Sequence, residues 1–264
     1  MKKPMYRLAV VAAVAAMLFT TIPLFASDTD DRIEASAQKT YVFKTYLKDD
    51  NIKIKSKDGL VTLTGTVQDP SHKSLAGETI AGLPGVKGVD NKLEEKDENR
   101  PAEKSDAWLI TKVKTALLFH RNVSGTGTEV LADNGTITLR GKAESLAQKD
   151  LTTEYAMDVE GVENVKNEMS VPEAGNETSG MKKKVVDKTN NLVESIDDAS
   201  ITALVKTSLL YHRSTSAVNT NVETKNGVVT LEGIAKTSAE KDLAGKYASD
   251  VNGVKYVNNN IIVE

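Results

Sequence analysis

Apolar side chains recur along the chain in two alternating periods, and their order is easiest to follow between residues 106 and 171. Residues 106–121 are apolar at every third or fourth position, which predicts an amphipathic helix with Asp106 at its start. Residues 128–132 and 136–143 alternate apolar and polar side chains on either side of Asn134-Gly135, a pair typical of a tight hairpin turn. A second helical period and a last alternating run follow. The pattern predicts the order helix, strand, strand, helix, strand.

The second helix of this unit begins with a capping sequence that recurs elsewhere in the chain. Ser145 precedes Gln148 by three residues, and Thr237 precedes Glu240 by the same spacing, so each pair predicts a capping box. An earlier copy has Asp69-Pro70 at the equivalent place, with the aspartate as cap and the proline at the first helical position. All three helices therefore have a defined start.

The whole unit occurs three times, and four of its landmarks recur without a gap. They are Gly59, Gly65, Gly85 and Asn91, then Gly135, Gly141, Gly161 and Asn167, then Gly227, Gly233, Gly253 and Asn259. These are turn formers and residues that allow close backbone approach, so the repeat specifies a fold more clearly than a chemistry. We expect the three asparagines to satisfy backbone groups at turns or strand ends.

Connection lengths set the topology of each unit. The hairpin strands must be antiparallel, and the crossover through the second helix makes the last strand parallel to its neighbour. We therefore predict an α+β fold of three small helix-strand-strand-helix-strand modules, each a three-stranded mixed sheet with two helices on one face. The other face lacks cover within a module. In the third copy it holds Val228, Thr230, Glu232 and Ile234, which favours cover by another unit or a partner.

The unit, with its Gly-Val-x-x-Val-x-Asn ending, resembles the BON domain of bacterial envelope proteins. The matching stretches are Gly85-Val86 to Val89 and Asn91, Gly161-Val162 to Val165 and Asn167, and Gly253-Val254 to Val257 and Asn259. The chain departs from the family pattern in its three copies, in a Leu-Leu-aromatic-His-Arg ending of two first helices, and in a shorter first loop. The resemblance implies association with phospholipid or envelope partners, protection during osmotic or envelope stress, and no enzymatic activity.

The repeat and the composition shifts between its copies divide the chain into six segments. We expect a signal peptide at 1–26, modules at 30–95, 105–172 and 196–264, and linkers at 96–104 and 173–195. In the second linker, Lys182-Lys183-Lys184 precedes an apolar stripe at helical spacing. This segment is either a short helix leading into the third module, which is the simpler interpretation, or a basic amphipathic helix contacting anionic lipid.

The amino terminus carries the features of an export signal. Three basic residues within Met1 to Arg7 precede an apolar run from Leu8 to Phe19, and we predict cleavage after Ala26. The alternative is an uncleaved membrane anchor, which the short, proline-interrupted run disfavours. The chain has no cysteine, which excludes a lipid-anchored lipoprotein form, disulfides and thiolate metal sites. We expect a soluble periplasmic protein after cleavage.

Charge and composition exclude further classes of ligand. Without the three cations of the predicted signal peptide, 31 basic residues face 37 acidic ones, a net charge of −6. A chain of this charge has no general attraction for nucleic acid, so any anionic ligand must meet a local patch. The three histidines show neither a nucleophile-histidine-acid arrangement nor metal-ligand spacing. We therefore expect no catalytic residues, no metal and no cofactor.

Two histidine-arginine pairs are the first candidate site. His120-Arg121 and His212-Arg213 follow Phe119 and Tyr211 at the ends of equivalent helices. The simpler interpretation is that these cations complement the helix dipoles. The functional interpretation is an aromatic and basic patch that binds a phosphate headgroup, with arginine giving bidentate contacts. A metal site shared by two modules is the weakest, since two histidines leave a coordination shell incomplete.

The single tryptophan is the second candidate. Trp108 stands near the start of a helix where the third copy has Ser200, so it belongs to the second module rather than to the shared fold. It either packs on the linker or anchors the helix at a membrane surface while Lys112 and Lys114 contact phosphates. The leading prediction is thus a non-enzymatic envelope-stress protein that binds anionic phospholipid. The alternative is a protein-interaction scaffold or chaperone that uses open sheet faces.

Overall fold

The fold is that of a computed structural model. It describes residues 24–96, 105–123, 127–172, 196–215 and 219–264. The predicted signal peptide falls mostly on residues 1–23, and the two predicted linkers, apart from Lys96, also lie outside the described residues, as does the basic segment at 182–184. Within the described ranges, no helix is both long and apolar enough to cross a membrane.

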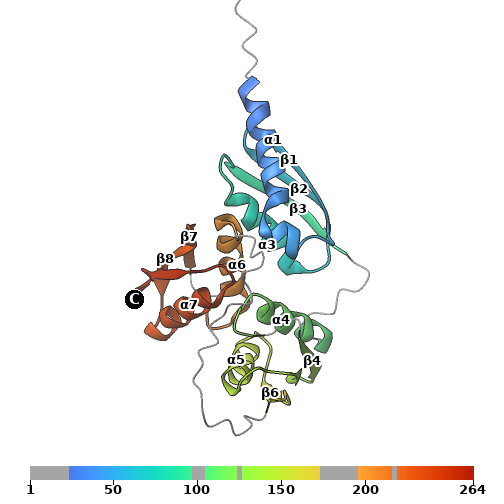
Figure 1. Cartoon of the computed structure of the whole chain (residues 1–264), viewed down its shortest axis with the longest axis vertical. Helices are drawn as coiled ribbons and strands as arrows, with labels where there is room; N and C mark the ends of the chain where they lie inside the picture. Colours follow the sequence, from blue (N-terminus) through green and yellow to red (C-terminus); the bar gives the residue numbers. More distant parts are fainter. Residues whose placement is uncertain (1–23, 97–104, 124–126, 173–195, 216–218) are drawn as a thin grey trace, which may run out of the picture.

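Three modules follow one another along the chain, each with the predicted order of elements, to which the first adds a short helix and the third a short last strand (Figure 1). The first consists of α1 (Leu24–Lys39), a short α2 (Tyr41–Thr45), β1 (Asn51–Lys57), β2 (Leu60–Val67), α3 (Pro70–Ala81) and β3 (Gly88–Glu95). The second consists of α4 (Asp106–Leu118), β4 (Thr128–Asp133), β5 (Thr136–Gly141), α5 (Leu146–Met157) and β6 (Asn164–Asn167). The third consists of α6 (Asp198–Tyr211), β7 (Asn219–Lys225), β8 (Val228–Ala235), α7 (Ser238–Asp250), β9 (Tyr256–Asn259) and β10 (Ile262–Val263).

Each sheet has the predicted mixed topology. In the second module β4 and β5 are antiparallel, with Val130 opposite Leu139, whereas β5 and β6 are parallel, with Ile137 opposite Val165. The first and third modules repeat this arrangement around β2 and β8. In the third module β10 adds a short parallel pairing beside the same central strand. The α+β prediction of three such modules is confirmed.

Local sequence explains the turns and helix starts. Asn134 and Gly135 have φ angles of 47° and 78°, as a type I′ hairpin turn requires, and the other two hairpins repeat these positive angles. The Ser145 side chain accepts a hydrogen bond from the backbone N–H of Gln148, and Thr237 caps its helix in the same way. Gly161 has φ +91° but lies in the turn before β6, beyond the end of α5, rather than capping the helix.

The repeated asparagine closes each module in the way the sequence suggests. The Asn167 amide donates to the carbonyl oxygen of Lys149 at 2.8 Å and to the Thr153 hydroxyl at 2.7 Å. Its own oxygen accepts from the backbone N–H of Met169 at 3.0 Å. Asn91 and Asn259 make the equivalent backbone contacts in the other modules. The side chain therefore joins a helix to the end of the last strand.

Replacing Asn167 with alanine is expected to lower the free energy of unfolding by about 1–2 kcal/mol, because partly buried backbone groups lose their partners. Urea denaturation followed by circular dichroism measures the loss. The matched control is Lys166→Ala, an exposed neighbour on β6, for which we expect a change within about 0.5 kcal/mol. Equal losses in both variants would contradict this role.

The three modules dock through their helices, with α6 near the centre of the molecule (Figure 1). Helix α3 of the first module packs against α6, where Lys206 and Glu78 form an ion pair at 2.7 Å. The Ser200 hydroxyl of α6 accepts from the backbone N–H of Val42 in the first module at 3.1 Å. Buried apolar side chains form one connected cluster that includes residues of all three modules. The modules are therefore one packed body in this structure.

Candidate functional site

The second and third modules meet at a buried pair of histidines. His120 follows α4 and His212 follows α6, and the two Nε2 atoms are 2.8 Å apart. The residues are only 2% and 0% exposed. Each imidazole stacks on a tyrosine of its own module, His120 on Tyr155 and His212 on Tyr247, with ring centroids 4.1 Å apart in both cases. The four rings form a compact aromatic cluster between the modules.

Two aspartates complete the cluster by reaching across the interface. The Tyr155 hydroxyl donates to Oδ2 of Asp250 at 2.7 Å, and the Tyr247 hydroxyl donates to Oδ2 of Asp158 at 2.7 Å. The same carboxylates lie 3.5 Å from His120 Nδ1 and 3.6 Å from His212 Nδ1, respectively. Each of these tyrosine–aspartate and histidine–aspartate contacts made by one module is matched by an equivalent contact of the other. The interface thus has a local pseudo-two-fold symmetry, as in a homodimer.

The arginines beside the histidines join the same interface through backbone groups. The backbone N–H of Arg121 donates to the carbonyl oxygen of Asp250 at 2.9 Å, and that of Arg213 donates to Asp158 at 2.7 Å. The Arg121 guanidinium donates to the carbonyl oxygen of Val254 at 3.0 Å and also to that of Ser249. The Arg213 guanidinium donates across the interface as well, to a carbonyl oxygen of α5. Both arginines therefore bind protein backbone of the opposite module.

Burial shifts the ionisation of the cluster. The loss of hydration, together with the neighbouring His120, lowers the pKa of His212 from 6.5 to about 3. Burial and the hydrogen bond to Asp250 raise the pKa of Tyr155, and burial and the bond to Asp158 raise that of Tyr247. The tyrosines therefore remain protonated donors, and His212 is neutral at neutral pH.

This placement changes both leading interpretations of the histidine-arginine pairs. The imidazoles are withdrawn from solvent, so in this arrangement they contact neither a headgroup nor the aqueous end of a helix. The sequence does contain a signal for their real partners. Tyr155 and Asp158 recur as Tyr247 and Asp250 at the 92-residue offset of the histidines, whereas the first module has Thr79 and Gly82 at the corresponding positions. The cluster is specific to the two modules that carry a histidine.

Metal binding finds no support in the described residues, where no group of three or more metal-ligating side chains comes together. The histidine pair supplies two imidazoles, and a metal shared between two modules needs more ligands than that. The two carboxylates are engaged by tyrosine hydroxyls and contact the ring nitrogens on the far side from the Nε2 contact.

The tryptophan site is separate from the histidine cluster. Trp108 is partly buried at the start of α4, and the Lys112 ammonium lies 4.1 Å from the centroid of its ring. Lys112 also pairs with the exposed Glu160 at 3.5 Å. Lys114 is exposed but lies about 200° further around the helix than Lys112, since each residue turns the helix by about 100°. The structure brings Trp108 and Lys112 together and leaves Lys114 on another side.

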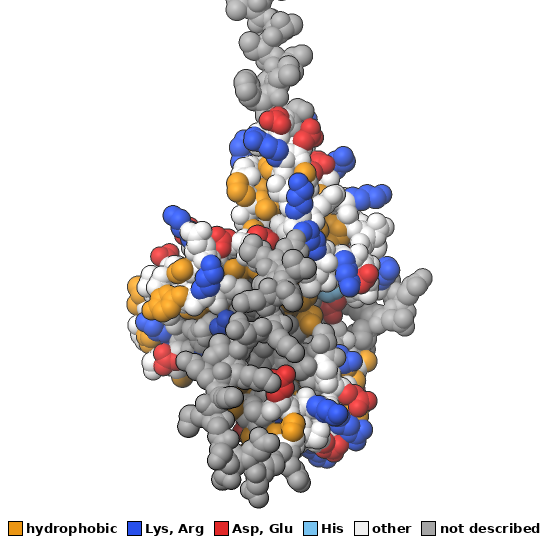
Figure 2. Space-filling model, viewed as in Figure 1, with side chains coloured by type: hydrophobic (Ala, Val, Ile, Leu, Met, Phe, Trp, Pro, Cys, Tyr) orange, Lys and Arg blue, Asp and Glu red, His pale blue; other side chains and the backbone are white. Residues whose placement is uncertain are grey.

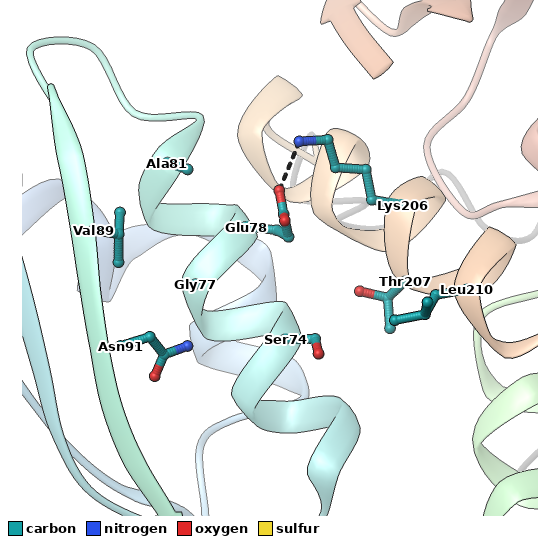
Figure 3. A pocket seen from close by; sticks show the side chains of 9 residues that line it. All are labelled: Ser74, Gly77, Glu78, Ala81, Val89, Asn91, Lys206, Thr207 and Leu210. Atoms are coloured by element: carbon teal, nitrogen blue, oxygen red, sulfur yellow. Dashed lines mark hydrogen bonds and ion pairs between the residues drawn. The ribbon is translucent and has the colours of Figure 1, made fainter. Parts of the chain in front are cut away.

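A groove of about 430 Å³ runs along the seam between the first and third modules (Figure 3). Its walls are α3, β3 and α6, and the ion pair between Glu78 and Lys206 crosses it. Its walls also carry the polar side chains of Ser74, Asn91 and Thr207. Asn91 is already bonded to Lys73 and Leu93 backbone. The groove is therefore best described as a seam between docked helices.

Comparison with known proteins identifies the repeated unit. The BON domain matches residues 29–97, 105–173 and 197–264. The Osmotically-inducible protein Y of Escherichia coli (strain K12) is 32% identical over 156 residues, which cover 59% of this chain and 71% of that protein.

Two further relatives show similar levels of identity. The Outer membrane lipoprotein DolP of Haemophilus influenzae is 28% identical over 159 residues, covering 58% of this chain and 80% of that protein. The 21 kDa hemolysin of Actinobacillus pleuropneumoniae is 32% identical over 115 residues, covering 43% of this chain and 59% of that protein.

Proposed function

Because the chain belongs to the BON domain family and carries three copies of the domain, we propose that it is a non-enzymatic periplasmic protein that protects the cell envelope under osmotic stress by binding anionic phospholipid. The names of two relatives, one osmotically inducible and one an outer membrane lipoprotein, support the envelope and stress parts of this proposal. The predicted signal peptide, which lies mostly outside the described residues, agrees with export. The proposed lipid contact must also be argued from exposed residues of this chain.

The observation that carries the lipid contact is the Trp108–Lys112 pair on α4. An indole suits the headgroup level of a membrane because its ring is apolar and its N–H is polar. The Lys112 ammonium, 4.1 Å from the ring centroid, places a cation at the same spot, where it can meet a phosphate. Its carboxylate partner Glu160 is 73% exposed, so this ion pair is readily exchanged for a phosphate in solution.

The other residues predicted to contact lipid differ in exposure and in their hydrogen bonds. Lys114 is exposed and adds long-range attraction to an anionic surface from another side of α4. Arg121 and Arg213 have exposed side chains, but their guanidiniums donate to carbonyls of the opposite module. His120 and His212 are buried, so they are not part of the proposed contact surface. The proposed site is therefore centred on the start of α4.

Sedimentation with vesicles tests this proposal. The chain from Ser27 onward is expected to sediment with phosphatidylglycerol vesicles and not with neutral phosphatidylcholine vesicles. The Trp108→Ala variant should bind roughly tenfold more weakly, as expected for the loss of one interfacial aromatic anchor. Lys112→Gln should also weaken binding to phosphatidylglycerol vesicles. The matched control is Lys225→Gln, an exposed lysine on β7 of the third module, which should bind as the unaltered chain does.

Salt distinguishes lipid contact from the main alternative. Binding through lysines should fall when ionic strength rises from about 50 to about 500 mM, because screening shortens the reach of surface charges. Absence of binding to phosphatidylglycerol at low salt would reject the lipid proposal. Equal binding by the Trp108→Ala variant would move the contact away from α4.

A protein-interaction scaffold is the second candidate, and the open face of the third module favours it. Ile234 of β8 lies opposite Ile262 of β10, and the two are 50% and 68% exposed. Tyr256 of β9, which is 63% exposed, pairs with Val228 six residues before Ile234 on β8, so the exposed apolar side chains form a discontinuous strip. Hydrophobic side chains are visible on this side of the molecule in Figure 2, where Figure 1 places β7 and β8. Apolar contacts between such a strip and a partner protein should be insensitive to ionic strength, unlike contacts made by lysines with a vesicle.

A further inference from the structure

The contact between the two imidazoles holds one proton. With their Nε2 atoms 2.8 Å apart, one nitrogen must donate and the other must accept, as in any hydrogen bond. Two fully protonated imidazoles would bring two N–H groups head to head at this distance. The Ser208 hydroxyl, 3.3 Å from His120 Nε2, is uncharged and does not relieve that conflict. The closed interface therefore accepts at most three protons on the four ring nitrogens.

Charged groups from each packed element surround the two imidazoles but do not raise the limit of three protons on their four nitrogens. Asp158 and Asp250 face the Nδ1 atoms, where they favour a proton on that side of each ring. On the interface rim, Arg121 Nε lies 3.9 Å from Asp250, and Lys246 of α7 pairs with Glu154 of α5 at 2.9 Å. The tyrosines Tyr155 and Tyr247 donate to the carboxylates, and Arg213 donates to backbone. None of these groups lies between the two Nε2 atoms.

We propose that the interface between the second and third modules is a proton-operated latch, closed while at least one of His120 and His212 is neutral and opened when both are protonated. The proposal rests on the head-to-head geometry, on the burial of both rings and on the pseudo-two-fold exchange of contacts. It is independent of the lipid contact on α4.

The direction of the pH effect follows from the protons bound in each state. The closed interface lowers the pKa of His212 to about 3, whereas a solvated histidine titrates near 6.5. The open state thus binds more protons between these values. The stabilisation of the closed state is complete above pH 6.5 and is lost as the pH falls toward 3. Opening would also release the Arg121 and Arg213 guanidiniums from the carbonyls of the opposite module.

A distance measurement across the interface tests the latch. Because the chain has no cysteine, Lys166→Cys and Asn258→Cys place one spin label on each module without competing sites. Both positions are exposed and are related by the same 92-residue offset as the histidines. We expect one fixed distance at pH 7.5 and a longer, broader distribution with a midpoint between pH 6.5 and 3. An unchanged distance down to pH 3 would overturn the proposal.

Histidine variants distinguish a pH response of the imidazoles from a pH response of the carboxylates. In His120→Gln, in His212→Gln and in the double variant a pair of cations cannot form, so the distance should not respond to pH. The matched control is His72→Gln, the third histidine, which bonds Asp50 within the first module and should respond as the unaltered protein does. A response of normal size in the double variant would assign the effect to Asp158 and Asp250 and overturn the proposal.

A second readout keeps the test decisive if the double variant is open at every pH. The imidazole Cε1 proton resonances of the unaltered protein report the protonation of each ring. We expect the last protonation of the His120 and His212 pair to coincide with the change in distance. Full protonation of both rings while the distance stays short would overturn the latch.

Discussion

Replacing Gly65 with alanine is expected to lower the free energy of unfolding of the first module by about 3 kcal/mol or more. Gly65 lies in β2 with φ +118°, and a Cβ atom built there would sit 1.9 Å from the carbonyl oxygen of Asn51 on the paired strand β1. A backbone oxygen in a paired strand can move only if the pairing is broken. Thermal and urea denaturation followed by circular dichroism measure the loss.

The same sheet supplies a matched control for this substitution. Gly88 of β3 has no positive φ, and a Cβ there would meet only the end of the Leu60 side chain, at 3.2 Å. That side chain can rotate, so Gly88→Ala should cost under about 1 kcal/mol. Similar losses in the two variants would show that the cross-strand carbonyl is not the obstacle at Gly65. The equivalent glycines Gly141 and Gly233 face backbone oxygens at 2.5 and 2.0 Å, so the constraint is common to all three modules.

Replacing Asp250 with alanine should lower the free energy of unfolding at neutral pH by about 3 kcal/mol, through loss of docking between the second and third modules. The Asp250 carboxylate accepts from the Tyr155 hydroxyl and from the Asn122 amide, and it lies 3.5 Å from His120 Nδ1. Its removal leaves a buried tyrosine hydroxyl without an acceptor. Urea denaturation at pH 7.5 measures the free energy, and the spin-label distance reports docking.

Symmetry and position give two controls for this prediction. Asp158→Ala removes the equivalent acceptor of Tyr247 and should cost a similar amount. Asp242 is exposed on the same helix as Asp250, and Asp242→Ala should change the free energy of unfolding by no more than about 0.5 kcal/mol. If Asp250→Ala were as mild as Asp242→Ala, the carboxylate would not contribute to docking.

The sequence located the unusual residues of the interface but not their role. The recurrence of His120-Arg121 as His212-Arg213 marks both pairs, and the local pattern predicts helix-dipole contacts, a phosphate site or, least favoured, a metal shared by two modules. In the structure these residues contact the opposite module. A residue that is buried only by docking has the same local pattern as one that faces water, so periodicity within a module cannot distinguish the two.

Ser200 illustrates the same limit from the other side. A small polar side chain at the position of Trp108 predicts that the shared fold requires no large side chain there. In the structure it is fully buried, and its hydroxyl accepts a hydrogen bond from the backbone N–H of Val42 in the first module. Trp108, in contrast, is partly exposed and lies beside Lys112.

By itself the sequence determined the fold of each module, because hairpin turns, helix caps and strand alternation are local and recur at fixed offsets. It also determined which repeated positions must be glycine or asparagine. The tertiary structure alone decided that α6 lies between the other modules and that His120 meets His212 across a pseudo-two-fold interface. The physical reason is that docking depends on complementary surfaces from residues about 90 positions apart, whose contact no local pattern encodes.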